Sequence, residues 1–345
     1  MNRKKKRPTI KEVAEAAGVS MQTVSRVINN RPDVADDTRQ RVKDVIQEIG
    51  YQPSALARSL IRKRSYTLGV LTAGLKFIGP NRTLNGITSA AEKAGYSLLL
   101  KELPNFNANN IEPIKNEFLS RQVDGIIWAA PEIGDNRAWL DDFKNEWNVP
   151  FVFLTMAPRE NLSIIAVDNY IGGRIATTHL LENGYRRIGH IAGPMDWWES
   201  RQRFRAWQDV VTAAGQTAVD RCWTEGNWSS RSGFQAAQAL VEKCPDLDAI
   251  FAGNDQMALG AYTFIRERGL TIPEDIGIVG FDNIAESEFF YPSLTTIQHD
   301  HIQVGTLAVE ELIRIIDAFE KNQEVEHRVT MLEPELLVRE SSIRK

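Results

Sequence analysis

The stretch Thr9-Ile-Lys-Glu-Val-Ala-Glu-Ala-Ala-Gly-Val-Ser-Met-Gln-Thr-Val-Ser-Arg-Val-Ile-Asn-Asn30 predicts two short helices joined by a tight turn. Thr9 and Glu12 have the spacing of a capping box, in which each side chain accepts a hydrogen bond from the backbone N–H of the other residue. Gly18 fits the left-handed position that ends a helix, and Ser20 can cap the helix that follows. Two helices across such a turn describe a helix-turn-helix.

The second helix of this pair has an apolar face and a polar face. Val24, Val27 and Ile28 recur at helical spacing and are expected to face inward. The opposite side carries the polar residues Gln22, Ser25, Arg26 and Asn29. Glutamine can pair with adenine and arginine with guanine in the major groove of DNA. A solvated surface helix has the same pattern, because lookalikes are common among small helical pairs, and this alternative stays open here.

Two further helices are expected downstream of the pair. Apolar spacing predicts a helix over residues 36–49, ended by Gly50. Tyr51-Gln52-Pro53 then interrupts the chain, and Ser54 can cap a short helix over residues 55–62. A segment of that length is not helical by itself in water, so it should order only against a partner chain or in a nucleic-acid groove.

The charge of the chain is unevenly distributed. Residues 1–64 hold 15 Lys and Arg against 7 Asp and Glu, whereas the rest of the chain holds 26 against 38. All eight tryptophans lie in this second part. The overall net charge of −4 is therefore an average over two differently built parts that join near residue 64. The basic part suits a polyanionic partner.

From Ser65 onward, short apolar runs alternate with helical patterns. The expected strands are 68–71, 96–100, 125–128, 151–154, 164–167, 188–191, 249–252 and 276–279, and the expected helices are 82–95, 110–121, 170–183, 199–214, 231–243 and 255–268. Alternation of this kind predicts parallel sheets flanked by helices. Roughly ten strands are more than one open sheet comfortably holds, which favours two α/β subdomains.

Polar and aromatic residues follow several of these strands. They are Asp168-Asn169, Trp197, Trp198, Arg201, Arg203, Arg205, Trp228, Asn254-Asp255 and Asp282-Asn283. Parallel sheets bind ligands at the carboxyl ends of their strands. Carboxylates, amides, a guanidinium and indole rings suit a polyhydroxylated ligand. Each residue also has a purely structural interpretation: Asp255 as a helix cap, Trp207 as a core residue, and Trp197-Trp198 as a loop packed on its neighbours.

The basic part closely resembles the DNA-binding region of one known family. Residues 9–30 resemble the DNA-binding domain of the lactose-repressor (LacI/GalR) family, and Tyr51-Gln-Pro-Ser-Ala-Leu-Ala-Arg-Ser-Leu60 is similar to its hinge helix. The resemblance implies that Met21, Gln22 and Arg26 read bases, and that Leu60 wedges into the minor groove beside Ala57, kinking the duplex. The full set of implied DNA contacts is Thr9, Ser20, Met21, Gln22, Thr23, Ser25, Arg26, Asn29, Thr38, Ser54, Ala57 and Leu60.

The acidic part resembles the same family in segments 192–194, 226–235, 254–261, 279–282 and 292–297. The resemblance implies an effector domain like the periplasmic binding proteins, with an apolar wall at Gly79 and Pro80. Arg203, Asn254 and Asp282 would hold sugar hydroxyls and Trp228 would stack on the sugar ring. The full set of implied ligand contacts is Gly79, Thr155, Trp197, Arg203, Trp228, Asn254, Asp282 and His299.

Three positions depart from the family pattern. Thr155 stands where a sugar-binding Asp is typical and His299 where a Gln lines the cleft, so galactoside specificity is not carried over. Ala35 stands where a Ser often caps the third helix, and we expect Asp36 or Asp37 to take over that cap. Trp197-Trp198 beside the site would enlarge an aromatic platform, which favours a glycoside or disaccharide.

The resemblance sets the expected domain boundaries. A helix-turn-helix domain spans 1–52, a hinge helix and linker spans 53–64, and an effector and dimerisation domain spans 65–345. Within the last, the N-subdomain is expected at 65–166 and 295–324 and the C-subdomain at 167–294 and 325–341. No leucine-heptad tail of the kind that joins two dimers follows residue 340, so we expect a homodimer.

Other classes of protein fit the sequence less well. It has no phosphate-binding loop, dinucleotide fingerprint, H-E-x-x-H or G-x-S-x-G motif, so we expect neither an enzyme nor a cofactor. His299 and His301 share a face of a strand-like run, but the pair lacks further ligands and predicts no metal site. The two cysteines predict neither a disulfide framework nor a zinc site. No membrane span or secretory signal is evident, which predicts a cytoplasmic protein.

We therefore expect a dimeric transcriptional repressor of carbohydrate-utilisation genes. It would bind a near-palindromic double-stranded DNA operator and be released by a sugar inducer through allostery. A sugar-responsive activator and a corepressor-dependent regulator of the same family remain alternatives. A transport-type sugar-binding protein would explain residues 65–345 but not the basic helical segment before them.

Overall fold

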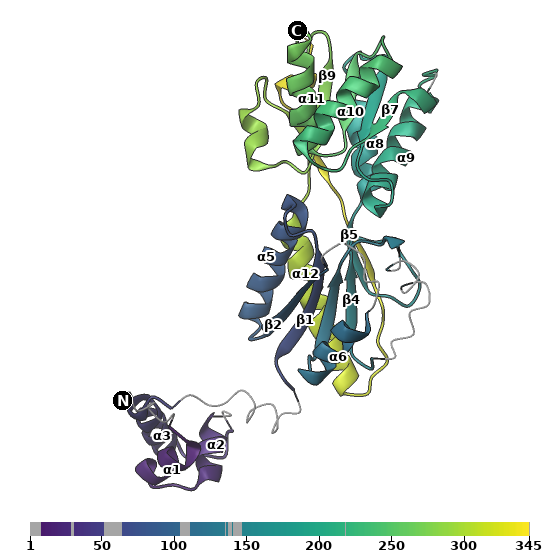
Figure 1. Cartoon of the computed structure of the whole chain (residues 1–345). Coiled ribbons are helices and arrows are strands. Elements are labelled where there is room, and N and C mark those ends of the chain that lie inside the picture. Colours follow the sequence, from purple (N-terminus) through teal and green to yellow (C-terminus); the bar gives the residue numbers. More distant parts are fainter. Residues whose placement is uncertain are drawn as a thin grey trace. The chain divides into compact units, whose positions relative to one another are not determined.

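The computed structural model describes residues 8–28, 31–51, 64–103, 111–134, 136, 140, 147–217 and 219–344 (Figure 1). The contacts divide the chain into two compact units, Met1–Tyr66 and Thr67–Lys345. Asn29 and the predicted hinge helix with Ser54, Ala57 and Leu60 lie outside the described residues. Each unit is considered by itself below.

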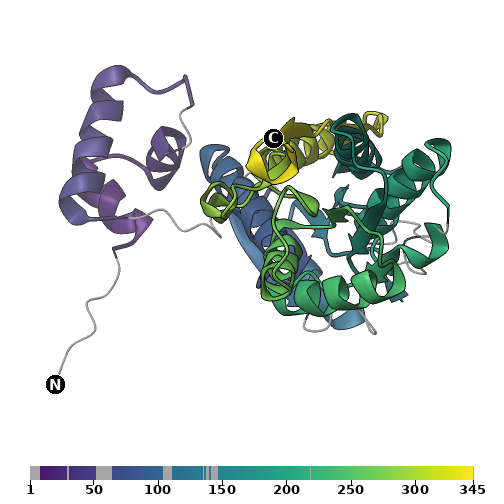
Figure 2. The ribbon, with the colours of Figure 1, turned by 90° about the horizontal axis from the view of Figure 1, so that it is seen from above.

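The first unit contains the predicted helix-turn-helix. Its helices are α1 (Ile10–Ala17), α2 (Met21–Ile28) and α3 (Asp36–Ile49), drawn in purple in Figures 1 and 2. The capping box is confirmed, because the Thr9 N–H donates to Glu12 Oε2 over 2.6 Å and the Glu12 N–H donates to Thr9 Oγ1 over 3.4 Å. Gly18 ends α1 at φ 64°, the left-handed conformation that glycine adopts without a steric cost.

Small branched side chains form the core between these helices. Val13, Val24 and Val42, one from each helix, are fully buried, and Val27 is 2% exposed. The predicted cap of α3 is wrong: the helix begins after Ala35 without any side-chain cap. Asp36 and Asp37 already lie in the first helical turn, where carboxylates interact favourably with the helix dipole without accepting a capping hydrogen bond.

The second unit contains two six-stranded sheets among its described residues. The first has the order β11-β5-β4-β3-β1-β2, and all neighbouring strands in it are parallel. Its strands are β1 (Thr67–Ala73), β2 (Ser97–Leu103), β3 (Gly125–Ala129), β4 (Phe151–Leu154), β5 (Ile164–Val167) and β11 (Val329–Leu332). Helices α5 (Ile78–Lys93), α6 (Glu112–Ser120) and α12 (His301–Glu320) accompany this sheet. We call this half the N-subdomain.

The second sheet has the order β12-β10-β9-β8-β6-β7 and is parallel except for its antiparallel edge strand β12. Its strands are β6 (Ile188–Ala192), β7 (Trp223–Glu225), β8 (Ala249–Ala252), β9 (Gly277–Phe281), β10 (Thr295–Gln298) and β12 (Glu335–Leu337). Helices α8 (Asn169–Glu182), α9 (Trp198–Ala213), α10 (Ser230–Lys243) and α11 (Asp255–Glu267) flank it. We call this half the C-subdomain, and Figure 1 shows it as the green lobe.

The chain crosses between the two sheets at places that differ from the expected boundaries. Residues 295–298 were expected in the N-subdomain, but they form β10, which pairs with β9 of the C-subdomain. Residues after 325 were expected in the C-subdomain, but β11 pairs with β5 of the N-subdomain. The sequence did not predict β7, β10, β11, β12 or α12. The four strands are three or four residues long, so they carry little local signal and form by pairing with distant strands.

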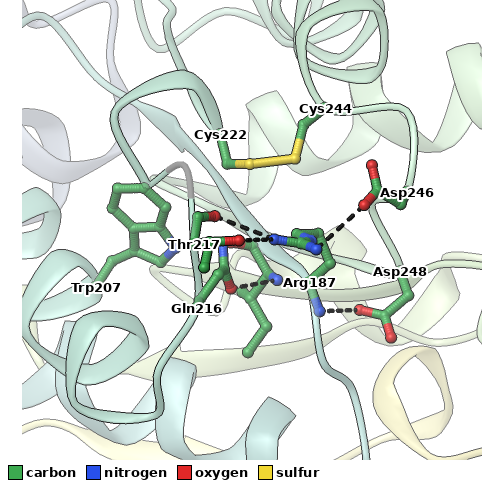
Figure 3. Close-up of a disulfide and its surroundings, with 9 residues drawn as sticks. Arg187, Trp207, Gln216, Thr217, Cys222, Cys244, Asp246 and Asp248 are labelled. Carbon is green, nitrogen blue, oxygen red and sulfur yellow. Dashed lines mark hydrogen bonds and ion pairs between the residues drawn. A yellow bond between two sulfur atoms is a disulfide. The ribbon is translucent and has the colours of Figure 1, made fainter.

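The sequence predicted no disulfide framework, but the two cysteines form one disulfide. Cys222 and Cys244 are bonded, with their Cα atoms 5.5 Å apart. The bond joins the residue before β7 to the residue that ends α10 (Figure 3). Beside it, the Arg187 side chain donates to the Thr217 carbonyl over 3.0 Å and pairs with Asp246 over 3.1 Å. Two cysteines allow only one pairing, but the sequence does not show that the fold brings them close enough to bond.

None of the helices in the described part of the chain is long and apolar enough to cross a membrane.

Candidate functional site

The exposed face of α2 carries the side chains predicted to read DNA. Met21, Gln22 and Arg26 are exposed, with Met21 at 52%, whereas Val24 and Val27 on the opposite side are buried. An exposed methionine beside an exposed arginine is a large side-chain surface that the first unit does not use for its own packing. Within the described part of the chain, the Arg26 side chain pairs with the exposed carboxylate of Asp33 at 3.5 Å, and a phosphate or a base can displace this carboxylate at little cost.

Ser20 and Thr23, two of the residues implied to contact DNA, also build the start of α2. The Thr23 N–H donates to Ser20 Oγ over 3.1 Å, and the two hydroxyls lie 3.0 Å apart. This cap fixes the N-terminus of α2, and helix N-termini attract phosphate groups. Thr38, in α3, is half-buried.

The second unit contains a cleft between its two subdomains. Its inner and middle sections are both lined by Gly79, Pro80, Trp197, Glu199 and His301. The middle section continues to a mouth with which it shares Phe77, Trp197, Trp228 and Gln256. The sections form one cleft with an apolar N-subdomain wall and a polar C-subdomain wall.

Arg203 is the buried cation of this cleft. It lies on α9, where its Nε donates to Asn169 Oδ1 over 2.8 Å and its Nη1 donates to the Gly253 carbonyl. Its guanidinium stacks on the Phe281 ring at 3.5 Å from the centroid. Burial lowers the pKa of Arg203 from its ordinary value, and the charge of Asp282 opposes that shift. These contacts hold the guanidinium in one orientation and leave Nη2 to face Asp282 at 4.0 Å.

Asp282 follows β9 and is the carboxylate beside this guanidinium. Its Oδ1 accepts a 3.2 Å hydrogen bond from His299 Nε2. Burial by itself would raise the pKa of Asp282, but the hydrogen bond from His299 and the charge of Arg203 lower it below its ordinary value. The site therefore holds an ionised carboxylate next to a guanidinium. Such a pair can accept and donate hydrogen bonds to neighbouring hydroxyl groups.

Trp228 forms an aromatic side of the cleft. Its ring lies against Gly193, packs edge-on to Trp197 at 6.0 Å between centroids, and has the Arg203 guanidinium at 5.6 Å. The Asn254 side chain fixes the loop by donating to the Trp228 carbonyl over 3.1 Å, while its Oδ1 caps α11. Asn254 is therefore a helix cap and a pocket residue at once.

Backbone conformation is unusual at three of the predicted ligand residues. Thr155, Trp228 and Asp282 have φ values of 50°, 70° and 106°, in the left-handed half of conformational space that non-glycine residues rarely adopt. Residues held in this way concentrate at functional sites, where the surrounding structure offsets the cost. Asp255 supplies part of that support: it is fully buried and accepts hydrogen bonds from the Ile284 N–H, Ser287 and Thr296.

Several buried polar atoms of the cleft have no hydrogen-bond partner in the described structure. They are Trp228 Nε1, Glu199 Oε2, His299 Nδ1 and His301 Nε2. Burial raises the pKa of Glu199 to about 7 and lowers that of His301 well below its ordinary value. An unsatisfied buried polar group costs about 1–3 kcal/mol, which a bound ligand can recover. Four such atoms around one cleft indicate a binding site.

The structure brings most of the predicted ligand residues together. Seven of the eight line the cleft: Gly79, Thr155, Trp197, Arg203, Trp228, Asn254 and Asp282. His299 lies behind Asp282 and is 8% exposed. The sequence did not single out Phe77, Glu199 or Gln256, although each is close in sequence to a predicted residue. Trp198 does not belong to the cleft, because it packs into the N-subdomain core at 6% exposure, and Trp207 is a core residue.

Comparisons with known proteins match both units. Residues 9–54 match the family model for bacterial regulatory proteins of the lacI family, and residues 177–342 match a periplasmic binding protein-like domain. The HTH-type transcriptional repressor PurR of Pasteurella multocida (strain Pm70) is 34% identical over 96% of this chain and 98% of its own. PurR of Haemophilus influenzae (strain PittEE) is 33% identical, with the same coverage. The chain belongs to the LacI family.

Solved structures agree with this assignment. The lac repressor dimer bound to operator and the anti-inducer ONPF superposes with a TM-score of 0.87 at 30% identity, covering 98% of this chain and all of that one. The transcriptional regulator CelR in complex with cellobiose superposes with a TM-score of 0.70, also at 30% identity, over 97% of this chain and all of that one. This LacI-family protein is thus a DNA-binding transcriptional repressor with a helix-turn-helix and two parallel-sheet subdomains, and the family consists of regulators rather than enzymes.

Proposed function

We propose that this LacI-family protein is a repressor of carbohydrate-utilisation genes that a sugar inducer releases from its operator. The observation that carries the proposal is the convergence of Arg203, Asp282, Asn254 and Trp228 on one cleft. Guanidinium, carboxylate and amide groups bind paired hydroxyls, and an indole packs against the apolar face of a sugar ring. The complex of the related CelR with cellobiose supports this chemistry.

The extent of the aromatic wall favours a ligand larger than one sugar ring. Trp197 lines all three sections of the cleft and packs between Trp228 and Phe77, with ring centroids at 6.0 and 6.4 Å. Beyond them the mouth offers polar groups from Asn227, Ser229 and Gln256. A disaccharide or a glycoside with an extended aglycone would contact both the inner and the outer groups.

A panel of ligands tests the sugar class. Monosaccharides, disaccharides, glycosides and nucleobases are screened by thermal shift on the purified full-length protein. A disaccharide or glycoside is expected to raise Tm, and Asp282→Ala should abolish that rise while operator binding is retained. If a nucleobase raises Tm and no sugar does, the effector is a planar heterocycle and not a sugar. Loss of operator binding in a folded Asp282→Ala protein would show that Asp282 is not an effector-binding residue.

The direction of regulation is tested separately. Operator affinity is measured with and without the stabilising compound, because binding of the operator and of the effector is coupled reciprocally. An inducer lowers operator affinity. A compound that raises operator affinity would be a corepressor. A reporter gene whose expression requires the protein would show that the protein is an activator.

We propose the DNA contacts from the family pattern and from the exposed face of α2. Two α2 helices of a homodimer would enter successive major grooves of a near-palindromic operator, and paired hinge helices with Leu60 would kink its centre. Leu60→Ala should weaken specific binding far more than non-specific binding in a competition assay. Equal losses on both kinds of DNA would contradict the wedge.

The homodimer also has support in the second unit. Phe289 and Tyr291 are 79% and 80% exposed, and Leu100 and Leu259 are 40% and 42% exposed. Exposed large apolar groups are typical of association surfaces. Light scattering on the full-length protein should give twice the chain mass of 38.9 kDa, and Phe289→Asp with Tyr291→Asp should shift it toward one chain. A monomeric wild type would contradict this assignment.

A further inference from the structure

Three metal-ligating side chains meet where the chain passes from the C-subdomain to the N-subdomain. Asp282 follows β9, His299 follows β10, and His301 is the first residue of α12. One potential ligand atom from each lies within 4.8 Å of the other two. The sequence shows only the histidine pair. The third ligand becomes visible in the fold, because the parallel neighbours β9 and β10 end at the same edge of the sheet.

The distances among these atoms are close to those around a metal ion. Asp282 Oδ1 and His299 Nε2 are 3.2 Å apart, and the two imidazole rings have centroids 4.1 Å apart. Metal–nitrogen and metal–oxygen bonds of about 2.0–2.2 Å place neighbouring tetrahedral ligands roughly 3.3–3.5 Å from one another. Small rotations of the side chains would bring all three ligands to that spacing.

Each histidine has a nitrogen that can coordinate. His301 Nε2 is buried and has no hydrogen-bond partner in the described structure. His299 Nε2, the nitrogen that faces Asp282, would exchange its hydrogen bond to Asp282 Oδ1 for a bond to the ion. His301 Nδ1 has only a long contact of 3.5 Å to Thr83 Oγ1.

The charge around the cluster sets how strongly it can hold a cation. Arg203 Nη2 lies 4.0 Å from Asp282 Oδ1, so its positive charge opposes a bound ion. Hydrogen bonds to Asn169 and to the Gly253 carbonyl hold the guanidinium in place. Binding weaker than at a structural zinc site is therefore expected.

We propose that Asp282, His299 and His301 bind one divalent transition-metal ion, of the kind that two imidazoles and a carboxylate prefer, with Zn²⁺ as the representative. Two imidazoles and one carboxylate suit Zn²⁺, Co²⁺ or Ni²⁺ better than Mg²⁺ or Ca²⁺. Three protein ligands leave a coordination position open. Because Asp282 and His301 line the cleft, that position faces the space where a ligand would lie. The ion would link the ends of β9 and β10 to α12 and so bridge the two subdomains.

The test uses full-length protein without an affinity tag and with its disulfide oxidised. Zn²⁺ is titrated calorimetrically, and Co²⁺ is followed by its visible absorption. His299→Gln and His301→Phe remove a ligand while keeping a side chain of similar size. His327→Gln is the matched control. His327 is an exposed histidine outside the cluster, and it contacts Ser163, the residue before strand β5 of the N-subdomain. Circular dichroism confirms that each variant is folded.

The expected result is one ion per chain in the wild type and in His327→Gln, and at least a tenfold loss of affinity in each cluster variant. Co²⁺ should give an absorption band that both cluster variants lack. No binding by the wild type, or binding that the cluster variants retain, overturns the proposal. The metal site shares Asp282 with the proposed effector site, but the two proposals fail separately: a sugar that stabilises the protein in EDTA supports the proposed function whether or not the metal binds.

Discussion

Gly193→Ala should destabilise the second unit by pushing on Trp228. A Cβ atom at residue 193 would lie 2.0 Å from Trp228 Cη2 and 2.2 Å from Cζ2, whereas ordinary contacts begin at 3.4 Å. The indole would have to move by about 1.4 Å, although it is only 8% exposed. Overpacking of this kind costs about 1–3 kcal/mol in the free energy of unfolding. Displacing the stacking surface by that distance should also weaken effector binding about five- to thirtyfold, the factor that corresponds to roughly one to two kcal/mol.

A double-mutant cycle isolates the contact. Urea unfolding is measured for the wild type, Gly193→Ala, Trp228→Ala and the double variant. In the Trp228→Ala background the added methyl group has space, so Gly193→Ala should cost less than ~0.5 kcal/mol there. An equal cost of Gly193→Ala in both backgrounds would show that the destabilisation does not act through Trp228, and the reasoning would be refuted.

Three other predictions follow from buried groups. Val24→Ala removes a fully buried side chain of the helix-turn-helix; a loss of about 2 kcal/mol is expected in that unit, with weaker operator binding and an unchanged melting of residues 67–345. Burial lowers the pKa of His190 to about 3, so as the pH falls below ~6.5 this histidine is protonated in the unfolded chain but not in the folded one. Between pH 7.5 and 5, the free energy of unfolding of the wild type should therefore fall by about 2 kcal/mol more than that of His190→Gln. Parallel pH profiles for the two proteins would contradict this. Replacing Cys222 and Cys244 by Ser should cost about 3 kcal/mol, and the oxidised wild type serves as the reference in calorimetry.

Local signals account for what the sequence predicted well. The capping box at Thr9, the left-handed Gly18 and the cap at Ser20 are confirmed in the helix-turn-helix. All eight predicted strands of the second unit are present as runs of apolar residues in parallel sheets, and all of them except the edge strand β2 are largely buried. Such features depend on residues within one or two turns of each other.

Features that depend on distant residues were not predictable in the same way. Cys222 and Cys244 are bonded because α10 packs on β7. The unpartnered Oε2 of Glu199 becomes a pocket feature only because α9 begins at the cleft. Neither of these has a signature in the neighbouring sequence.

The sequence by itself determined that the chain joins a basic helical reader to an acidic α/β body, since charge balance and apolar periodicity are local properties. It also placed the candidate polar residues after their strands, because parallel strands expose their carboxyl ends at one edge. Only the tertiary structure decided which sheet takes β10 and β11, and which side chains share the cleft. Strand pairing and burial bring Asp282 to His299 and His301, and the free energy that selects these contacts belongs to the packed molecule and not to any segment.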